Sequence, residues 1–255
     1  MSDLPGLSRK AARRKRRQRV SVIGVLGELL ITAGVLVFLF LGWQLWLNDL
    51  IVGDQQNHEA ASIVKTWDAA GDPARETPTV VDYGDPIVED APANAKTFAV
   101  MYVPRFGADW TRQIAEGIGV ADVLNTKRIG HYPTTQMPGA VGNFAVAAHR
   151  LTYGAPFRDI DQLQIGDKIY VATKDGYYTY IFRNLEYVNK HGVGVLDPVP
   201  QLPAVDPTQR LLTLMSCNPK YSVAERIVAY ALFDSWRPIS DGPPAEIAPL
   251  VNAKD

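Results

Sequence analysis

Apolar residues gather in one long segment near the N-terminus, from residue 20 to 47, which is broken by Glu28 and Gln44. The 19 residues from Leu29 to Leu47 carry no charge and would form about 28 Å of helix, enough to cross the hydrocarbon core of a bilayer. A cleaved signal peptide would have a shorter apolar stretch, with a clear site of small residues after it. The pattern therefore predicts an uncleaved transmembrane anchor over residues 20–47.

The next segment, residues 48–95, is mostly polar. Residues 48–70 could form a short polar helix, and residues 71–95 are rich in Pro, Asp, Glu and Ala. A segment of the latter composition cannot bury enough apolar surface to offset the loss of chain entropy on ordering. We expect residues 48–95 to form a stalk or linker between the anchor and a folded domain.

From residue 96 to 238 the apolar residues occur in short runs that resemble β-strands. Residues 143–149 form one such run, and residues 168–173 and 177–188 flank a Lys-Asp-Gly turn that indicates a hairpin. About eight such runs with few helices between them are typical of a closed barrel or a sandwich. The predicted fold class is mainly β, in one domain that is followed by a C-terminal tail over residues 239–255.

Charge is distributed unevenly along the chain. Eight Lys or Arg and no acidic residue lie between Arg9 and Arg19, directly before the apolar segment. By the positive-inside rule, the basic tail over residues 1–19 stays in the cytoplasm and the rest of the chain is exported. The chain after residue 48 carries 18 basic and 25 acidic residues, which argues against nucleic-acid binding by the folded part.

The sequence contains one cysteine, Cys217, at the end of an apolar run that begins at Leu211. Asn218-Pro219 breaks this run, so the thiol should lie where a buried strand meets a loop. A second β-like run begins at Arg226, which would bring a guanidinium to the same end of the sheet. Single cysteines are usually inert and buried, but a lone exported thiol is open to oxidation, so its presence favours a chemical role.

A nucleophilic thiol needs a partner that takes its proton or keeps it ionised. The candidates are the four histidines of the chain: His58, His131, His149 and His191. His149 ends a buried strand, as Cys217 does, and is favoured over His131, which lies in a loop rich in Pro and Gly. A histidine with a purely structural role is the alternative.

An arginine could stabilise an oxyanion or bind a carbonyl or carboxylate through its forked donors without losing its proton. Arg226 is the candidate, Arg150 and Arg210 compete with it, and an ordinary surface salt bridge is the alternative. The sequence has no HExxH or paired CxxC spacing and no phosphate-binding glycine loop. No metal and no cofactor are therefore expected.

Five motifs occur in a specific order: GHYP, MPG, GNFAVAAHR, YGAPF and TLMSCNP, with an arginine nine residues after the cysteine. Together they closely resemble the sortases, the membrane-anchored cysteine transpeptidases of Gram-positive bacteria, and most of all class E, the housekeeping group of actinobacteria. The resemblance covers roughly residues 97–236. It implies an eight-stranded sortase β-barrel with His149, Cys217 and Arg226 as the catalytic trio.

The resemblance also implies two substrate-binding residues. The family pattern usually reads TLTTC followed by His or Tyr, where this chain has Met215, Ser216 and Asn218 around its cysteine. Ser216 keeps the hydroxyl that is expected to contact the substrate. Class E sortases are similar in preferring LAXTG to LPXTG, a choice attributed to a tyrosine near the site, and Tyr132 is the candidate here.

The implied activity is cleavage of an LAXTG- or LPXTG-type sorting signal after Thr. The resulting thioester would be resolved by an amine of a lipid-linked peptidoglycan precursor. The expected partners are therefore exported proteins that carry this signal, the precursor and the membrane. The expected location is the cell membrane, with a single span, a cytoplasmic N-terminus and an extracellular catalytic domain.

Two alternatives belong to other functional classes. A cysteine endopeptidase would use the same residues but would resolve the thioester with water rather than an amine. A non-catalytic wall-binding β-domain would instead have Cys217 buried and inert.

Overall fold

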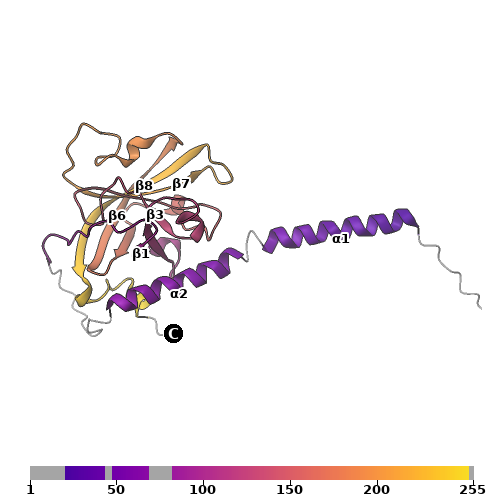
Figure 1. Cartoon of the computed structure of the whole chain (residues 1–255), viewed down its shortest axis with the longest axis horizontal. Coiled ribbons are helices and arrows are strands. Elements are labelled where there is room, and N and C mark those ends of the chain that lie inside the picture. The colour runs from indigo at the N-terminus through magenta and orange to yellow at the C-terminus, as the bar shows by residue number, and fades with distance from the viewer. Residues whose placement is uncertain (1–20, 44–47, 69–81, 253–255) are drawn as a thin grey trace, which may run out of the picture. The chain divides into compact units, whose positions relative to one another are not determined.

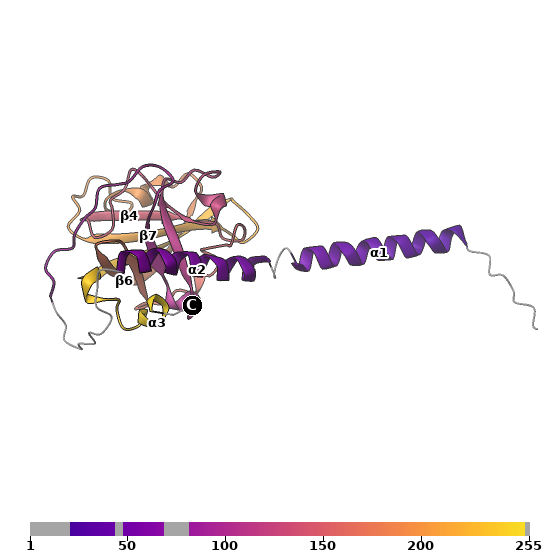
Figure 2. The same cartoon turned by 60° about the horizontal axis from the view of Figure 1, so that its bottom comes forward.

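The computed structural model describes residues 21–43, 48–68 and 82–252. The chain divides into two compact units, the first ending at Leu45 and the second beginning at Trp46. The second unit contains a closed β-barrel, which Figures 1 and 2 show from two directions. All the residues that the sequence singles out for chemistry lie in this unit.

The first unit contains helix α1, Val22–Gly42. The hydroxyl of Ser21 accepts a hydrogen bond of 3.4 Å from the amide of Gly24 and so caps the start of the helix. The helix has 21 residues and is long and apolar enough to cross a membrane. It lies inside the expected anchor, whereas the expected basic tail over residues 1–19 is outside the described residues.

The barrel has eight strands in the order β1-β2-β3-β4-β7-β8-β6-β5, which confirms the mainly β prediction. Most neighbours are antiparallel, but β2 pairs with β3 and β4 pairs with β7 in parallel. The strands are β1 Thr97–Tyr102, β2 Thr111–Glu116, β3 Ile129–His131, β4 Gly142–Ala147, β5 Lys168–Ala172, β6 Gly176–Asn189, β7 Arg210–Asn218 and β8 Glu225–Pro238. The short helices among and after them are η2 Pro104–Phe106, η3 Leu124–Thr126, η4 Ile160–Gln162, η5 Val193–Leu196, η6 Ile239–Asp241 and α3 Ala248–Val251.

Strand β7 shows how the alternation of side chains separates the core from the outer wall. Leu212 and Leu214 are fully buried in the main apolar core of the barrel. Met215 points the other way and packs with Val228 and other residues in a smaller cluster on the wall. Cys217, two residues beyond Met215, is therefore on the outer face of β7.

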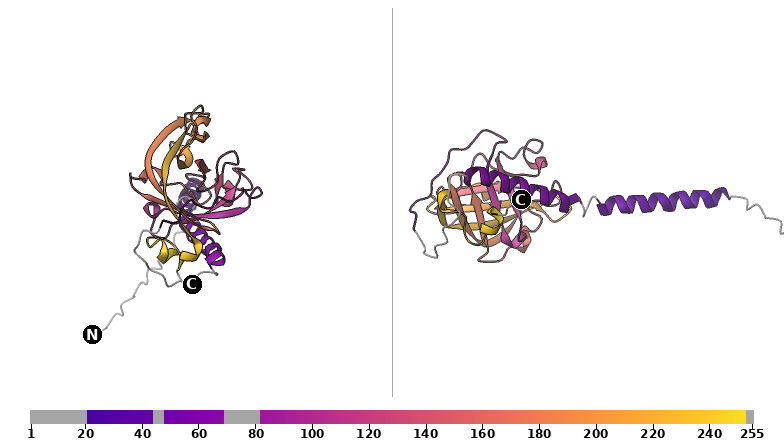
Figure 3. Two further views of the ribbon diagram at one scale, coloured as in Figure 1. Left: turned by 90° about the vertical axis from the view of Figure 1, so that its left-hand side faces the viewer. Right: turned by 90° about the horizontal axis from the view of Figure 1, so that it is seen from below.

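Helix α2, Asn48–Asp68, packs directly on the barrel. Its buried face is a stripe with a spacing of four residues: Val52, Gln56, Ala60 and Val64. Ala60 and Val64 join a cluster that includes residues of β1, β5, β6 and α3. In Figure 3, α2 and the C-terminal segment lie together against the barrel. Part of the expected stalk is thus a component of the folded unit.

The chain that precedes β1 and the chain that follows β8 also contact the barrel. Trp236 Nε1 donates a hydrogen bond of 3.0 Å to the carbonyl of Gly84, and Ile247 and Val251 of the expected tail are buried. The folded unit therefore begins before residue 96 and continues past residue 238. The contact before β1 is made by a backbone carbonyl, and the buried apolar side chains after β8 are few, so the sequence pattern does not reveal either contact.

Candidate active site

The parallel pairing of β4 and β7 brings His149 and Cys217 to the same end of the barrel. Ala147 and Met215 are partners in this pairing, and His149 and Cys217 each come two residues later. The strand ends stay connected beyond the last pair, since the amide of Ala148 donates to the carbonyl of Met215 at 3.2 Å. Two segments far apart in the sequence thus end side by side.

Cys217 lies directly opposite Arg226 in the antiparallel pairing of β7 and β8. Opposite residues of an antiparallel pair project from the same face of a sheet, so the thiol and the guanidinium share the outer wall. Both side chains are partly buried. Arg226 Nη1 donates to the carbonyls of Val223 and Glu225, at 3.1 and 2.8 Å, which holds the guanidinium against the turn between the strands.

His149 is held by two neighbours that come from different loops. Its Nε2 is 2.9 Å from Oδ1 of Asn125, and its ring packs against the ring of Tyr153 with centroids 5.2 Å apart and planes tilted by 30°. Since the amide oxygen accepts, Nε2 carries a proton and Nδ1 is the nitrogen left for proton transfer. Partial burial lowers the pKa of His149 below its usual value, because it disfavours the imidazolium.

Tyr132 lies close to the same wall. It follows β3, and its hydroxyl donates a 3.4 Å hydrogen bond to the sulfur of Met215. Burial raises the pKa of the Tyr132 phenol, the positive charge of Arg226 opposes this shift, and a negative charge on Cys217 adds to it. Tyr132 is thus near enough to interact electrostatically with both residues of the Cys217–Arg226 pair.

Ser216 faces away from Cys217 and is buried. Its hydroxyl donates a hydrogen bond of 2.8 Å to the carbonyl of Ala148, the residue before His149. In this structure Ser216 therefore ties the end of β7 to the segment that carries His149.

The competing histidine, His131, lies inside the barrel. Its side chain is fully buried, with Nδ1 2.7 Å from Oε2 of Glu116 and Nε2 3.1 Å from the carbonyl of Gln136. These contacts give both nitrogens structural partners away from solvent. The two remaining histidines, His58 on α2 and His191 before η5, are exposed.

The competing arginines also have structural positions. Arg150 is buried, donates from Nη1 to the carbonyl of Cys217 at 3.3 Å and to Oδ1 of Asn218 at 2.6 Å, and pairs through Nη2 with Asp161 at 2.9 Å. It clamps the backbone at Cys217. Arg210 lies at the opposite end of β7 from the thiol.

Two residues that contact His149 were not predicted from the sequence. Tyr153 is part of the YGAPF motif, which could have drawn attention to it, but Asn125 lies in η3, 24 residues before His149, and has no local signal. Within residues 21–43, 48–68 and 82–252, no group of three or more His, Cys, Asp or Glu side chains is arranged to hold a metal ion. The candidate site consists of a thiol, an imidazole and a guanidinium at one end of the barrel wall.

Comparisons with known proteins match this architecture. The family model described as the sortase domain matches residues 101–233. Sortase SrtE1 of Streptomyces coelicolor is 35% identical over an alignment of 249 residues that covers 93% of this chain, and the chain spans 66% of that relative's length. Sortase SrtE2 of the same organism is 28% identical over 88% of this chain and 87% of its own.

Solved structures of sortases also superpose on this chain. The SrtA sortase from Actinomyces oris superposes with a TM-score of 0.61 and 36% identity, over 65% of this chain and 94% of its own. Sortase E1 from Streptomyces coelicolor, crystallised with a tripeptide in its active site, superposes with a TM-score of 0.56 and 36% identity, over 62% of this chain and 99% of its own. Fold and sequence agree, and the protein belongs to the sortase family, whose members are cysteine transpeptidases.

Proposed function

We propose that this protein is a class E sortase that joins exported proteins to the cell wall by acyl transfer through Cys217. The observation that carries the proposal is the register of three strands. Cys217 is opposite Arg226, and His149 comes at the same distance beyond the β4–β7 pair as Cys217 does. A nucleophile, an acid–base group and a fixed cation at one strand end are what acyl transfer requires.

In the first half of the reaction, the sulfur of Cys217 attacks the Thr carbonyl of the sorting signal. His149 accepts the thiol proton at Nδ1, which the contact with Asn125 leaves free for this purpose. The lowered pKa of His149 supports this role, because a largely neutral imidazole can take the proton as the carbon–sulfur bond forms. The guanidinium of Arg226 stabilises the negative charge that develops on the carbonyl oxygen.

The imidazolium of His149 then gives its proton to the nitrogen of the departing glycine. The carbon–nitrogen bond breaks and a thioester on Cys217 remains. In the second half, neutral His149 takes a proton from the incoming amine as that amine attacks the thioester. The thiolate of Cys217 leaves and regains its proton, so the enzyme returns to its starting state.

The wall beside Cys217 supports recognition of an apolar sorting signal. Met215 and Val228 form part of a cluster there, and Tyr132 packs against it. We assign Tyr132 a role in selecting the residue between Leu and X of LAXTG or LPXTG. Ser216 is assigned an indirect role in substrate binding, since its hydroxyl bonds the carbonyl next to His149.

Helix α1 supports a single-span anchor, because it is long and apolar enough to cross the bilayer. The basic residues before it favour a cytoplasmic N-terminus and an extracellular catalytic domain. At the outer membrane surface the enzyme would meet both exported proteins and a lipid-linked peptidoglycan precursor, which would supply the accepting amine.

The test uses the full chain in detergent micelles with LAXTG and LPXTG peptides, with and without triglycine as the amine. Mass spectrometry should detect a product joined after Thr that depends on the amine and is lost in Cys217→Ala. If the peptides are cleaved but triglycine changes neither the rate nor the product, the result would favour an endopeptidase. No turnover of either peptide would overturn the assignment in favour of a binding domain.

A further inference from the structure

The orientation of His149 depends on two loops that are distant in sequence. Asn125, in η3, contacts Nε2 of the imidazole, and Tyr153, in the loop after β4, packs against its ring. Displacement of either loop would let the imidazole rotate about its side-chain bonds. What holds the two loops therefore also holds the acid–base group.

Both loops contain residues with a Cβ in the left-handed region of backbone conformation. Lys127, two residues after Asn125, has a φ of 72°, and Tyr153 and Ala155 have φ values of 51° and 40°. This conformation is unfavourable for such residues and persists where surrounding contacts impose it. Each turn therefore needs support from outside its own segment.

Helix α2 contacts both turns from one face. Gln56 is 6% exposed, and its Nε2 donates a hydrogen bond to the carbonyl of Lys127. Val52 approaches Gly154, the neighbour of Tyr153, so closely that a Cβ on this glycine would lie 2.8 Å from Cγ1 of Val52. Val52 and Gln56 are four residues apart, so they project from the same side of the helix.

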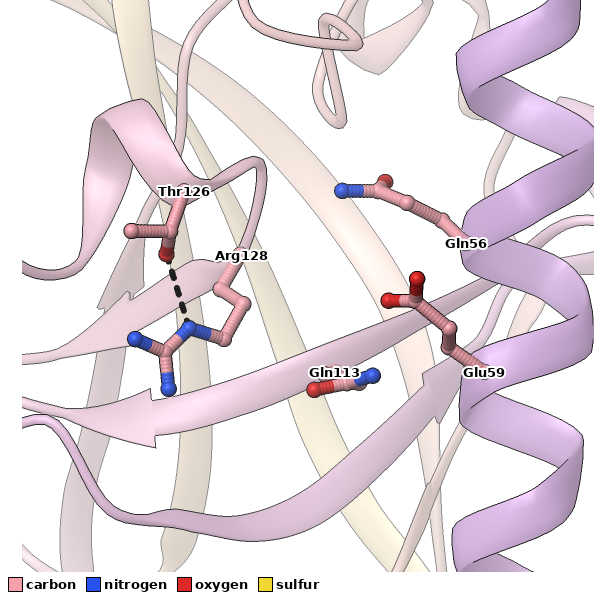
Figure 4. A pocket seen from close by; sticks show the side chains of 5 residues that line it. All are labelled: Gln56, Glu59, Gln113, Thr126 and Arg128. Atoms are coloured by element: carbon pink, nitrogen blue, oxygen red, sulfur yellow. Dashed lines mark hydrogen bonds between the residues drawn. The ribbon is translucent and has the colours of Figure 1, made fainter.

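The hydrogen bond from Gln56 to Lys127 lies beside a pocket between α2 and the loop. A polar pocket of about 170 Å³ lies between α2 and the loop, and Figure 4 shows its lining, with Gln56 extending from the helix toward the loop. The loop is held on its barrel side by Arg128, whose Nη1 donates to the carbonyl of Ala95 at 2.7 Å. On the helix side, the hydrogen bond from Gln56 to the carbonyl of Lys127 connects α2 to the loop.

We propose that α2 positions His149, with Gln56 acting through the Lys127 turn and Asn125, and Val52 acting through Gly154 and Tyr153. Gln56 and Val52 are positioning residues that touch neither thiol nor substrate. The role in catalysis rests on the proposed function, whereas the effect on imidazole orientation does not. The acyl-transfer site is complete only when α2, the helix that follows α1 in the sequence, is seated on the barrel.

The test compares Gln56→Leu with Gln55→Ala in the full chain in detergent micelles. Leu keeps the apolar bulk of the buried side chain but removes the donor, and Gln55 is the exposed neighbour on the same helix. Nitrogen-15 NMR of the imidazole should show His149 mostly protonated at Nε2 in the wild type and in Gln55→Ala. In Gln56→Leu it should show a mixture of the two tautomers.

Steady-state kinetics of the variants provide a second, independent measurement. We expect Gln56→Leu to lower kcat about tenfold, less than the roughly 10²-fold that a 1 Å misplacement of a reacting group can cost, because the effect passes through the Lys127 turn and Asn125. The KM should change by less than about twofold. In an Asn125→Ala background the same substitution should have little further effect, because the route through Asn125 is already broken. An unchanged tautomer in a folded Gln56→Leu variant, or effects of the two substitutions that simply multiply, would overturn the proposal.

Val52→Ala keeps the proposal testable if Gln56→Leu does not fold. It removes two methyl groups beside Gly154 and should give the same mixture of tautomers by loosening Tyr153. A wild-type tautomer in folded Val52→Ala would then contradict the positioning role. Should the enzyme lack transpeptidase activity altogether, the tautomer readings would still decide whether α2 orients His149.

Discussion

Cys217 and Arg226 are directly opposite each other on adjacent antiparallel strands, β7 and β8, which a turn connects. The register of the two strands fixes this relationship, since a slip of one residue would move one side chain to the opposite face of the sheet. The pair is thereby built into the barrel wall. Its chemistry should respond sharply to the identity of the cation.

Arg226→Lys and Arg226→Ala should both reduce kcat/KM by about 10²–10³-fold, the usual cost of losing an oxyanion donor. Lys keeps the charge but lacks the planar fork of donors, so it should restore little activity. Steady-state assays with the LAXTG peptide check this, with Arg183→Lys on the exposed side of β6 as a matched control. Wild-type activity in Arg226→Lys would show that charge alone is enough.

The imidazole of His149 should titrate below the ordinary histidine pKa of about 6.5, because burial disfavours its charged form. NMR titration of the Cys217→Ala variant measures this without interference from the thiol. Tyr153→Ala should expose the ring and raise the midpoint toward the ordinary value. A midpoint above that value in the Cys217→Ala protein would contradict the burial of His149.

The same shift predicts how stability depends on pH. The pKa of His149 is lower in the folded than in the unfolded state, so the unfolded state binds the proton more readily. The contribution of His149 to stability should be present above about pH 6.5 and be lost as the pH falls through the lowered pKa. Urea unfolding across this range should show a smaller acid loss in His149→Gln than in the wild type.

Arg150→Met should destabilise the fold by about 2 kcal/mol, since it leaves the carbonyl of Cys217 and the side chains of Asn218 and Asp161 without their shared donor. Urea unfolding monitored by tryptophan fluorescence measures the loss. Arg105→Met is the control, because it removes a more exposed ion pair with Asp167 and should cost less. Equal losses in the two variants would contradict the role of Arg150 as a buried clamp.

Much of the barrel could be predicted from the sequence because its strands are short apolar runs between Gly and Pro turns. The meeting of Cys217 with Arg226 also follows locally, since both lie at the ends of consecutive strands. Arg150 could be named only as a competitor of Arg226 for the proposed catalytic role, because its contacts depend on the side chain of Asp161, eleven residues away. Asn125 could not be found, since its contact with His149 depends on where η3 lies in the folded barrel.

The structure differs most from the sequence-based expectation at helix α2, which packs on the barrel although its residues were expected to belong to a stalk. A stripe containing one Gln and one Ala among two Val residues does not resemble a buried helix face, so the composition of residues 48–70 indicates a polar segment. In the structure Gln56 is buried, and its Nε2 donates a hydrogen bond to the carbonyl of Lys127. A polar side chain that is buried by such a tertiary contact carries no hydrophobic signal in the sequence.

The packing of α2 predicts where a stable fragment begins. A fragment over residues 46–255 should fold cooperatively, whereas a fragment over 82–255, which keeps the barrel contact of Gly84, should unfold at a lower temperature because the cluster around Ala60 and Val64 is lost. Differential scanning calorimetry of the two fragments measures the difference. Equal midpoints would show that α2 contributes nothing to the stability of the barrel.

The most direct test of the acyl-transfer mechanism is intact-mass spectrometry of the full chain after incubation with an LAXTG peptide and no added amine. We predict a covalent adduct with the mass of the peptide up to Thr, located on Cys217 by digestion. Adding triglycine should discharge the adduct, and Cys217→Ala should not form it. An adduct on another residue, or amine-dependent ligation that persists in Cys217→Ala, would contradict the assignment of Cys217 as the nucleophile.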